Sequence, residues 1–388
     1  MIKKLKTKAV QFTFGLLPMF CLMACATDFK GLGNYKTETY VIDDLEYQSQ
    51  PLSKDQYSID RVCSLSYPDG LLKIYPDWFV VKNDRIYTLE QYKFYVFDLK
   101  GKLLYQAGEA VGRNSFVDNE GNIHTFRESL QKIFVYNSKG EVSKVLYTEK
   151  EFDSPNLMGL TNNGRYMFEF IRNTNGYALT ICDKSNRFQR GLIPFEKEHA
   201  WMGISRFFQN EGRLSHIPQY SDSVLVFRND TLEKVVRVDF KGQDIMHKNP
   251  EALERIGKTD EVHDSTNILG ISEYQETESF KYFHYVYKDR IQRRLIKKST
   301  NEILSGSNFF EGFDILFNNS FYLSGNQLIA VVNEENVEMV RNAKRDDVWM
   351  DNYNKSAPQV QALIDGKIKT PAVFFISLKW DKITLPTR

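Results

Sequence analysis

Short segments in which apolar and polar residues alternate recur along most of the chain, and polar turns separate them. The pattern is plainest in residues 79–104, and it returns in residues 116–142 with the same order of segments. Alternation with a period of two is typical of half-buried strands. Each copy also has a Lys-Gly turn, at Gly101 and at Gly140, where glycine adopts a positive φ without steric cost. We therefore predict antiparallel strands joined by tight hairpins.

The arrangement recurs at intervals of about 40 residues, the spacing of several blade-forming repeats. Weaker copies lie at residues 158–168 with 177–183, 207–214 with 223–230, 282–287 with 293–297, and 320–323 with 327–332 and 372–378. Four antiparallel strands in each such unit are the signature of a β-propeller blade, and blades close radially so that few strand edges are exposed. We predict an all-β, six-bladed β-propeller of four-stranded antiparallel blades, with seven blades as the alternative.

The two ends of the chain are expected to close the ring. Residues 37–43 are predicted to form an extra strand before the first full unit and to share a blade with the last strand, residues 372–378. Residues 242–262 and 334–366 interrupt the strand pattern with helix-like composition, and residues 354–364 favour a further short helix. We interpret both segments as insertions on the face of the disc where repeat proteins usually bind.

The N-terminal segment has the layout of a secretory signal. Residues 1–8 are basic, and residues 9–23 are mostly apolar but shorter than the roughly 20 residues that span a bilayer. The following Leu22-Met23-Ala24-Cys25 resembles the lipobox of bacterial lipoproteins. This resemblance implies residues 1–24 as a signal peptide, Cys25 as the lipid attachment site, residues 25–36 as a tether and residues 37–388 as the β-propeller domain. An ordinary secretory signal, in which Cys25 has no role, is the alternative.

The composition limits the classes of molecule that the protein is expected to bind. The chain has 388 residues, with 51 Lys and Arg against 50 Asp and Glu, so its net charge of +1 argues against nucleic acid as a partner. A hydrophobic content of 42% supports a packed globular body. Without the signal and Cys25, the remaining cysteines are Cys63 and Cys182. We expect both to be buried strand residues, and one long-range disulfide is the alternative.

Three runs carry a resemblance to a known family. They are residues 84–108, 116–126 and 220–240, and the whole body resembles the six-bladed β-propeller lipoproteins common in Bacteroidota, which are related to NHL-type propellers. The resemblance implies the propeller fold and an outer-membrane lipoprotein in the cell envelope, facing either the periplasm or the outside. The resemblance does not imply any particular reaction. The chain departs from the family pattern at residues 109–112, where many members have a Gly-rich turn.

Sequence motifs for catalysis are missing from the chain. It has no serine-hydrolase elbow, no P-loop, no dinucleotide fingerprint and no HExxH or His/Cys cluster, so we predict neither a metal nor a cofactor. The adjacent His263 and Asp264 form the densest His/carboxylate position, which suits a divalent-cation contact, an acid/base pair or a solvated loop. His124 lies on a predicted strand and is either packed or a ligand in the central channel.

Aromatic side chains supply the other candidate ligand-binding residues. Trp201, Trp349 and Tyr353 lie near loops or insertions, where rings can stack on sugar faces, although core packing is the alternative for each. The basic residues in 290–294 and 297–298 are interpreted as the polar edge of a blade. We favour a non-enzymatic, lipid-anchored module that binds a protein partner or a glycan. An envelope glycan hydrolase or lyase and a structural subunit of an outer-membrane uptake complex remain as alternatives.

Overall fold

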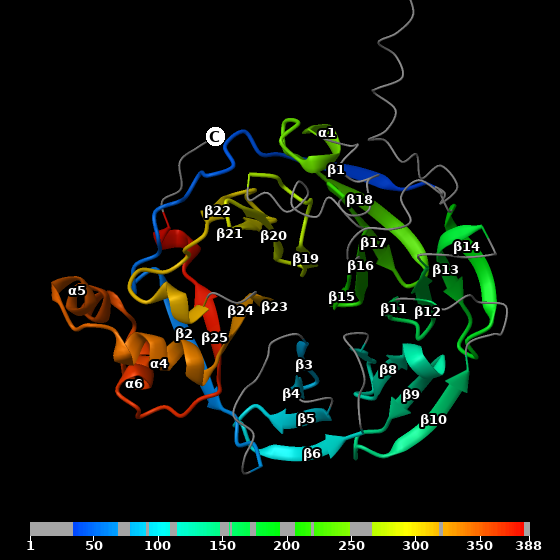
Figure 1. Cartoon of the computed structure of the whole chain (residues 1–388), viewed down its shortest axis with the longest axis horizontal. Coiled ribbons are helices and arrows are strands. Elements are labelled where there is room, and N and C mark those ends of the chain that lie inside the picture. The colour runs from blue at the N-terminus through cyan, green and yellow to red at the C-terminus, as the bar shows by residue number, and fades with distance from the viewer. Residues whose placement is uncertain are drawn as a thin grey trace, which may run out of the picture.

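Six β-sheets are arranged as a ring about a central axis (Figure 1). The computed structural model describes residues 34–68, 78–90, 93–108, 115–147, 155, 157–170, 176–194, 206–218, 221–248, 266–317 and 321–383. The predicted six-bladed β-propeller is therefore confirmed, with six blades rather than seven. Within the described residues, no helix has the length and apolar character needed to cross a membrane.

The blades follow one another along the chain, each from its inner to its outer strand. Blade 1 is β3 (Phe79–Lys82), β4 (Arg85–Glu90), β5 (Lys93–Asp98) and β6 (Leu103–Ala107). Blade 2 is β7 (Ser115–Val117), β8 (Ile123–Arg127), β9 (Lys132–Tyr136) and β10 (Val142–Tyr147). Blade 3 is β11 (Leu157–Leu160), β12 (Tyr166–Glu169), β13 (Tyr177–Cys182) and β14 (Phe188–Pro194). Blade 4 is β15 (Arg206–Asn210), β16 (Arg213–Ile217), β17 (Ser223–Arg228) and β18 (Thr231–Asp239). Blade 5 is β19 (Glu273–Glu276), β20 (Phe280–Tyr287), β21 (Arg290–Lys297) and β22 (Ile303–Gly306).

Blade 6 closes the ring with strands from both ends of the chain. It consists of β23 (Tyr322–Ser324), β24 (Gln327–Val332), β25 (Ala372–Leu378) and, outermost, β2 (Tyr57–Ser64). The sequence analysis assigned the shared strand to residues 37–43, and this was wrong. That segment forms β1 (Lys36–Val41), which pairs in parallel with β18 and gives blade 4 a fifth strand.

A recurring five-residue hairpin explains why the blade pattern was visible in the sequence. In the turn after β5, Asp98 Oδ1 accepts from the amides of Lys100 and Lys102 at 2.8 and 2.9 Å, and Gly101 has a φ of +82°. A short polar side chain thus holds the first position, and a residue that tolerates positive φ holds the fourth. The same first and fourth positions are occupied by the pairs Asp118 and Gly121, Asn137 and Gly140, and Asp183 and Asn186.

The connections differ between the two ends of the blades. Within each of the first five blades, the first and second strands and the third and fourth strands are joined by short hairpins at one end, which we call the turn face. The strand ends that begin and finish the second-to-third connections and the links between blades lie at the other end, the connection face. These include the long stretches at residues 240–272, which contain α1 (Ile245–Lys248), and at residues 333–371.

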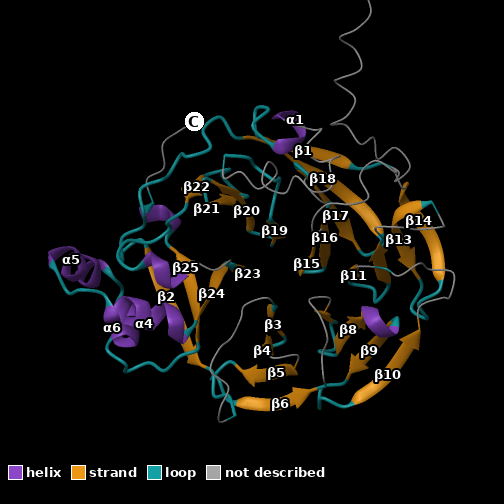
Figure 2. Ribbon diagram, in the orientation of Figure 1, coloured by secondary structure: helices purple, strands orange, loops and turns teal. Residues whose placement is uncertain are grey.

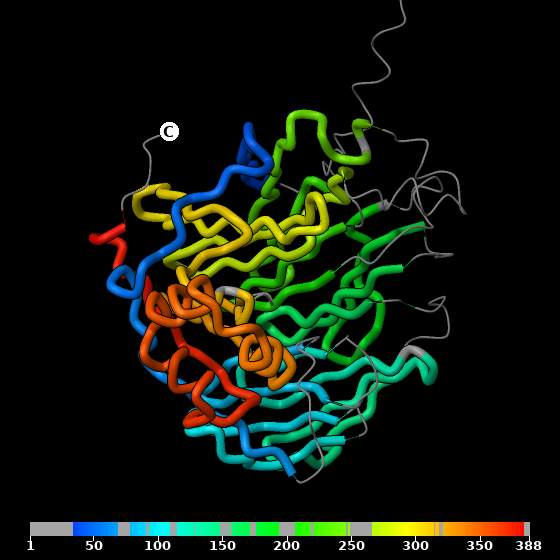
Figure 3. Tube along the Cα trace, turned by 60° about the vertical axis from the view of Figure 1, so that its left-hand side comes forward, coloured from blue at the N-terminus to red at the C-terminus, as the bar shows by residue number. Residues whose placement is uncertain are grey.

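The second insertion forms three helices beside blade 6, namely α4 (Glu334–Asn342), α5 (Asp347–Lys355) and α6 (Pro358–Ile364) (Figures 2 and 3). The expectation of helices here is confirmed. The helices leave from the connection face but fold back along the outer side of the blade, where Gln359 Nε2 donates to the Ile59 carbonyl of β2 at 3.2 Å. The expectation that this insertion projects over the binding face was therefore wrong for these helices.

Apolar side chains fill the spaces between neighbouring blades. One cluster joins blades 5 and 6 to the helical insertion, and others join blades 2 to 4, blades 4 and 5, blades 6 and 1, and blades 1 and 2. Cys63 on β2 and Cys182 on β13 are buried and are not joined in a disulfide, as expected. The core of this fold is therefore a ring of blade interfaces.

Candidate functional site

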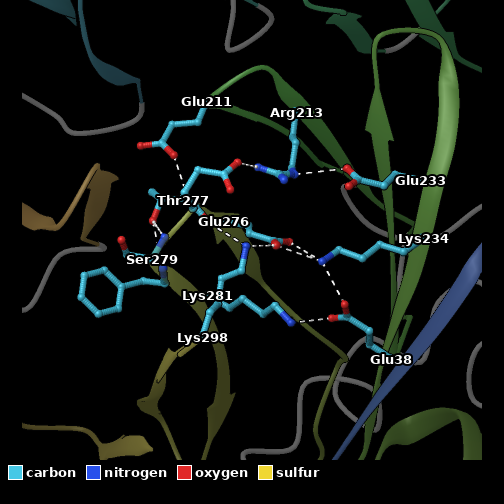
Figure 4. Close-up of polar contacts among 12 residues, drawn as sticks. Glu38, Glu211, Arg213, Glu233, Lys234, Glu276, Thr277, Ser279, Lys281 and Lys298 are labelled. Carbon is cyan, nitrogen blue, oxygen red and sulfur yellow. Dashed lines mark hydrogen bonds and ion pairs between the residues drawn. The ribbon is translucent and has the colours of Figure 1, made fainter. Parts of the chain in front are cut away.

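The N-terminal strand β1 is joined to blades 4 and 5 by a charged cluster (Figure 4). Glu38 on β1 accepts from Lys234 Nζ of β18 at 3.2 Å and from Lys281 Nζ of β20 at 2.6 Å. Tyr40, two residues further on and therefore on the same face of β1, accepts from Lys281 Nζ at 2.7 Å. Glu276 and Lys298 of blade 5 complete the cluster. We call Glu38, Lys234, Glu276, Lys281 and Lys298 the ionic clasp.

Glu276 is the buried centre of the clasp. Its side chain is 1% exposed, and its carboxylate lies 2.8 Å from Lys234 Nζ and 2.9 Å from Lys298 Nζ. The Tyr274 hydroxyl donates to it at 2.8 Å. Burial alone would raise the pKa of Glu276, but the hydrogen bonds and charges of the two lysines outweigh burial and hold that pKa at about 2. Glu276 is therefore ionised at neutral pH.

A second set of ion pairs continues from the clasp toward the turn face. Arg213 on β16 contacts Glu233 Oε2 through Nε at 3.2 Å and Glu278 Oε1 through Nη1 at 3.1 Å. Glu211, in the β15–β16 turn, accepts from the backbone amides of Glu278 and Gly325 at 2.9 and 2.8 Å. Blades 4, 5 and 6 are thereby tied together at the turn face.

The chemistry of the clasp suits attachment better than proton transfer. Both carboxylates of the clasp face ammonium groups, and the pKa of Glu38, which is half-buried, is also lowered, because the lysine contacts outweigh the effect of its burial. A general acid or base works best when its pKa lies near the working pH. These carboxylates do not meet that condition, so we interpret the clasp as the fixing point of β1.

Side chains from blades 4, 5 and 6 also meet at the inner strands. Gln275 on β19 accepts from the amide of Leu323 at 2.8 Å and donates to the Phe321 carbonyl at 2.7 Å. Asn210 at the end of β15 donates to the Leu323 carbonyl at 2.9 Å. Because blades 4 and 6 are not neighbours in the ring, this contact bridges the inner edge of blade 5.

All four histidines in the described part of the chain are paired with carboxylates. His124 Nε2 lies 3.1 Å from Asp118 Oδ2, and its Nδ1 lies 2.9 Å from the Tyr166 hydroxyl. The other pairs are His216 with Glu169 at 3.1 Å, His247 with Asp244 at 2.7 Å, and His284 with Glu273 at 3.3 Å. Nowhere in the described ranges do three His, Cys, Asp or Glu side chains gather as a possible metal site.

The imidazole of His124 helps to lower the pKa of Asp118. Burial would raise the pKa of Asp118, but hydrogen bonds from His124 and from Asn122 lower it to about 2. The group joins blades 2 and 3, because Tyr166 lies on β12 and Asp118 follows β7. The structure thus places His124 in a hydrogen-bonded blade interface.

Of the other predicted ligand-binding residues, Trp349 and Tyr353 lie in the described part of the chain and contact each other. Trp349 is 6% exposed, donates from Nε1 to the Val340 carbonyl at 3.0 Å, and stacks on Tyr353 within the helical insertion. Tyr353 donates to Asp365 Oδ1 at 3.0 Å. The remaining predicted residues lie outside the described residues: Cys25, Trp201, His263 and Asp264.

The basic residues on β21 were predicted to form the polar edge of a blade, and this was wrong. Strand β21 lies between β20 and β22, and Arg293 and Arg294 are 1% and 3% exposed. Arg293 donates to the Ser307 carbonyl and lies over the Phe321 ring, while Arg294 donates to the Tyr285 hydroxyl at 2.9 Å. Buried guanidinium groups need such partners, and the sequence alone does not show them.

The sequence patterns indicated neither the clasp nor any of the four histidine–carboxylate pairs. The clasp combines side chains from β1, β18, β19 and β20, so no local spacing identifies it. A local signal existed only for His247, three residues after Asp244, and for His124, which faces Asp118 across one hairpin. The other two pairs depend on the register between strands or on the packing of neighbouring blades.

No family model and no curated protein matches the chain. A solved structure from Bacteroides fragilis, described as an exported protein, is similar with a TM-score of 0.66 and 12% sequence identity, covering 89% of this chain and 100% of its own. A member of the DUF4221 family from Bacteroides vulgatus has a TM-score of 0.48 and 10% identity, covering 83% and 98% of the two chains. At these identities, the first likeness concerns the fold alone.

Proposed function

We propose that the protein is a lipid-anchored binding module of the cell envelope, attached through Cys25, which presents its connection face to a protein partner or a glycan. The lipobox-like residues 22–25 support the anchor. The similar Bacteroides fragilis protein is described as exported, which agrees with an envelope location. The observation that carries the proposal is the way in which β1 enters the disc.

The direction of β1 follows from its pairing. Strand β18 starts at the hairpin after β17, on the turn face, and runs to the connection face. Strand β1 is parallel to β18, with Lys36 opposite Lys234 and Val41 opposite Asp239. Lys36 therefore lies toward the turn face, and the chain leading back to Cys25 departs from there.

The clasp fixes β1 to the disc, so the direction of β1 decides which face lies near the lipid. The ten residues between Cys25 and Lys36 are few: even a random-coil chain of that length spans only on the order of 20 Å, which is less than the width of a typical domain. Because Glu38 and Tyr40 are bound to blades 4 and 5, the short tether cannot be lengthened by release of β1 without breaking partly buried ion pairs. The turn face is thus held near the lipid, and the connection face points away from it.

Cysteine labelling tests this orientation. Ser138→Cys on the turn face and Arg290→Cys on the connection face would each add one exposed thiol, while Cys63 and Cys182 are buried. The lipidated chain, reconstituted on vesicles, is treated with a bulky maleimide. We expect Arg290→Cys to react at the same rate as in detergent and Ser138→Cys to react several-fold more slowly on vesicles. Equal rates at both positions, or attachment to uncharged phosphatidylcholine vesicles that survives Cys25→Ser, would count against the proposal.

A second candidate is an envelope glycan hydrolase or lyase, and His216 favours it. Its side chain is 3% exposed, Nε2 contacts Glu169, and Nδ1 is buried without a hydrogen-bond partner among the described residues. A carboxylate-oriented imidazole with a free nitrogen is suited to proton transfer. Turnover of an envelope glycan that His216→Gln abolishes, and that His247→Gln leaves intact, would support it.

A further inference from the structure

We propose that the outer hairpins of blades 1 to 3 form a basic arc on the turn face, and that this arc binds the anionic headgroups of the lipid surface to which the protein is anchored. The inference rests on the proposed function, because the anchor places this face beside the membrane. It adds a second, electrostatic contact to the acyl chains.

The arc is built from the hairpins between the third and fourth strands. Blade 1 contributes Lys100 and Lys102, blade 2 contributes Lys139, and blade 3 contributes Lys184 and Arg187. All five side chains are exposed. In the described part of the chain, no ion pair holds any of the four lysines, and Arg187 pairs with Asp183 of its own hairpin. The lysine charges are therefore available to an external anion.

The acidic residues of the same hairpins do not cancel this charge fully. Asp98 and Asp183 each accept two backbone amides at the first position of the turn, and both are only partly exposed. Asn137, which is uncharged, has the same role in blade 2. Glu141 is the one exposed acid among these three hairpins. The turn chemistry thus draws the carboxylates toward the backbone, while the lysines extend from it.

The arc ends where the chain enters the disc. In blade 4, Arg228 pairs with Glu233, and in blade 5, Lys297 pairs with Glu302 while Lys298 belongs to the clasp. Among the outer hairpins of blades 1 to 5, the described cations without an ion-pair partner thus lie on blades 1 to 3. Lys36, at the start of β1, is exposed beside them on the blade 4 edge. An anionic surface that meets the tether would therefore also meet the arc.

Lipid headgroups are the occupant that these observations favour. The arc runs around the rim of a disc, so it matches a flat surface, and the tether leaves from the same face. Clustered lysines beside a membrane anchor increase attraction to anionic lipids, and the effect falls with salt. Binding of the arc to a soluble acidic protein would be a different outcome, and the experiment distinguishes it from binding to lipid.

The test uses the full chain with Cys25→Ser, so that acylation cannot mask the electrostatic contact. Binding is measured by sedimentation with vesicles of phosphatidylcholine alone and with vesicles that also contain phosphatidylglycerol. The arc variant replaces Lys100, Lys102, Lys139 and Lys184 with Gln. The matched control replaces four exposed lysines of the connection face with Gln, namely Lys93, Lys241, Lys248 and Lys288, and so changes the net charge equally.

We expect the parent and the control to bind phosphatidylglycerol vesicles equally, and the arc variant to bind at least about tenfold more weakly. High salt should remove the difference. Equal binding by all three proteins, equal loss in the two variants, or no preference for phosphatidylglycerol would overturn the proposal. Circular dichroism and thermal unfolding would be used to check that both variants are folded.

The lipid anchor and the basic arc can be refuted independently of each other. Mass spectrometry of Cys25 in the native chain reports lipidation without reference to the arc. A lipidated Cys25 with no arc binding refutes the arc alone, whereas arc binding without lipidation refutes the anchor alone. A partner protein that protects the arc lysines from acetylation in the absence of vesicles, with no binding to lipid, would also overturn the lipid assignment.

Discussion

Replacing Glu276 by Gln should strongly destabilise the protein, because it leaves Lys234 and Lys298 facing a neutral group in a buried site. The pKa of Glu276 falls from an ordinary value of 4.5 to about 2 in the folded chain. At 1.36 kcal/mol for each unit, this corresponds to about 3 kcal/mol of stability at neutral pH. Removal of one partner from a buried ion pair typically costs about 3–5 kcal/mol. Both routes therefore predict a loss near 3 kcal/mol.

The lowered pKa of Glu276 also predicts how the free energy of unfolding changes with pH. A carboxyl group whose pKa is depressed on folding contributes its full stability above its unfolded pKa, here about 4.5, and loses it as the pH falls toward 2. Urea unfolding of the parent and of Glu276→Gln should therefore differ most at pH 7, and the difference should shrink below about pH 4.5. Glu46→Gln is the control, because its carboxylate is exposed and pairs with Lys288. If Glu276→Gln cost no more than Glu46→Gln, the clasp would not be a stabilising contact.

Three further predictions concern single positions. Gly101→Ala should lose about 1–3 kcal/mol more than Gly325→Ala, measured by urea unfolding: both have positive φ, but a Cβ at Gly101 would lie 2.0 Å from the Ser64 carbonyl oxygen, while Gly325 has open space. Burial lowers the pKa of Lys82 to about 8, so folding favours its neutral form; the parent should gain stability between about pH 8 and 10.5, and Lys82→Met should not. Burial raises the pKa of the Cys63 thiol to about 11, so a maleimide should label it only after denaturation, and rapid native labelling would contradict the buried position.

The blades were predictable because their determinants are local. Strands β3 to β6 show alternation over a few residues, and the hairpin after β5 requires a polar acceptor at Asp98 and a positive φ at Gly101. Both requirements appear directly in the sequence. Their recurrence at about 40 residues then implies radial closure, because an isolated four-stranded blade cannot bury both of its faces.

The closing strand was not predictable in the same way. Strand β2 contains Asp60 and Arg61 in its middle, and its register with β25 shifts between Ile59 and Arg61. The shift disrupts the period of two, so β2 lacks the pattern that identified the other strands. Strand β1 alternates more regularly, yet it lies on blade 4. Which edge a strand joins depends on contacts with residues hundreds of positions away, and here these include the bonds of Glu38 to Lys234 and Lys281.

The basic arc was hidden from the sequence for a different reason. The hairpins that carry its lysines are about 40 residues apart along the chain, so no short window contains all of them, and the net charge of +1 gives no indication of a basic surface. The hairpin itself explains how they come together. The fold constrains the first position, which accepts the amides, and the fourth, which needs positive φ, but it leaves the second, third and fifth free. Lys100, Lys102, Lys139 and Lys184 all occupy free positions. Substitution there should change the charge of the turn face without changing the turn, which is why the arc variant can separate lipid binding from folding.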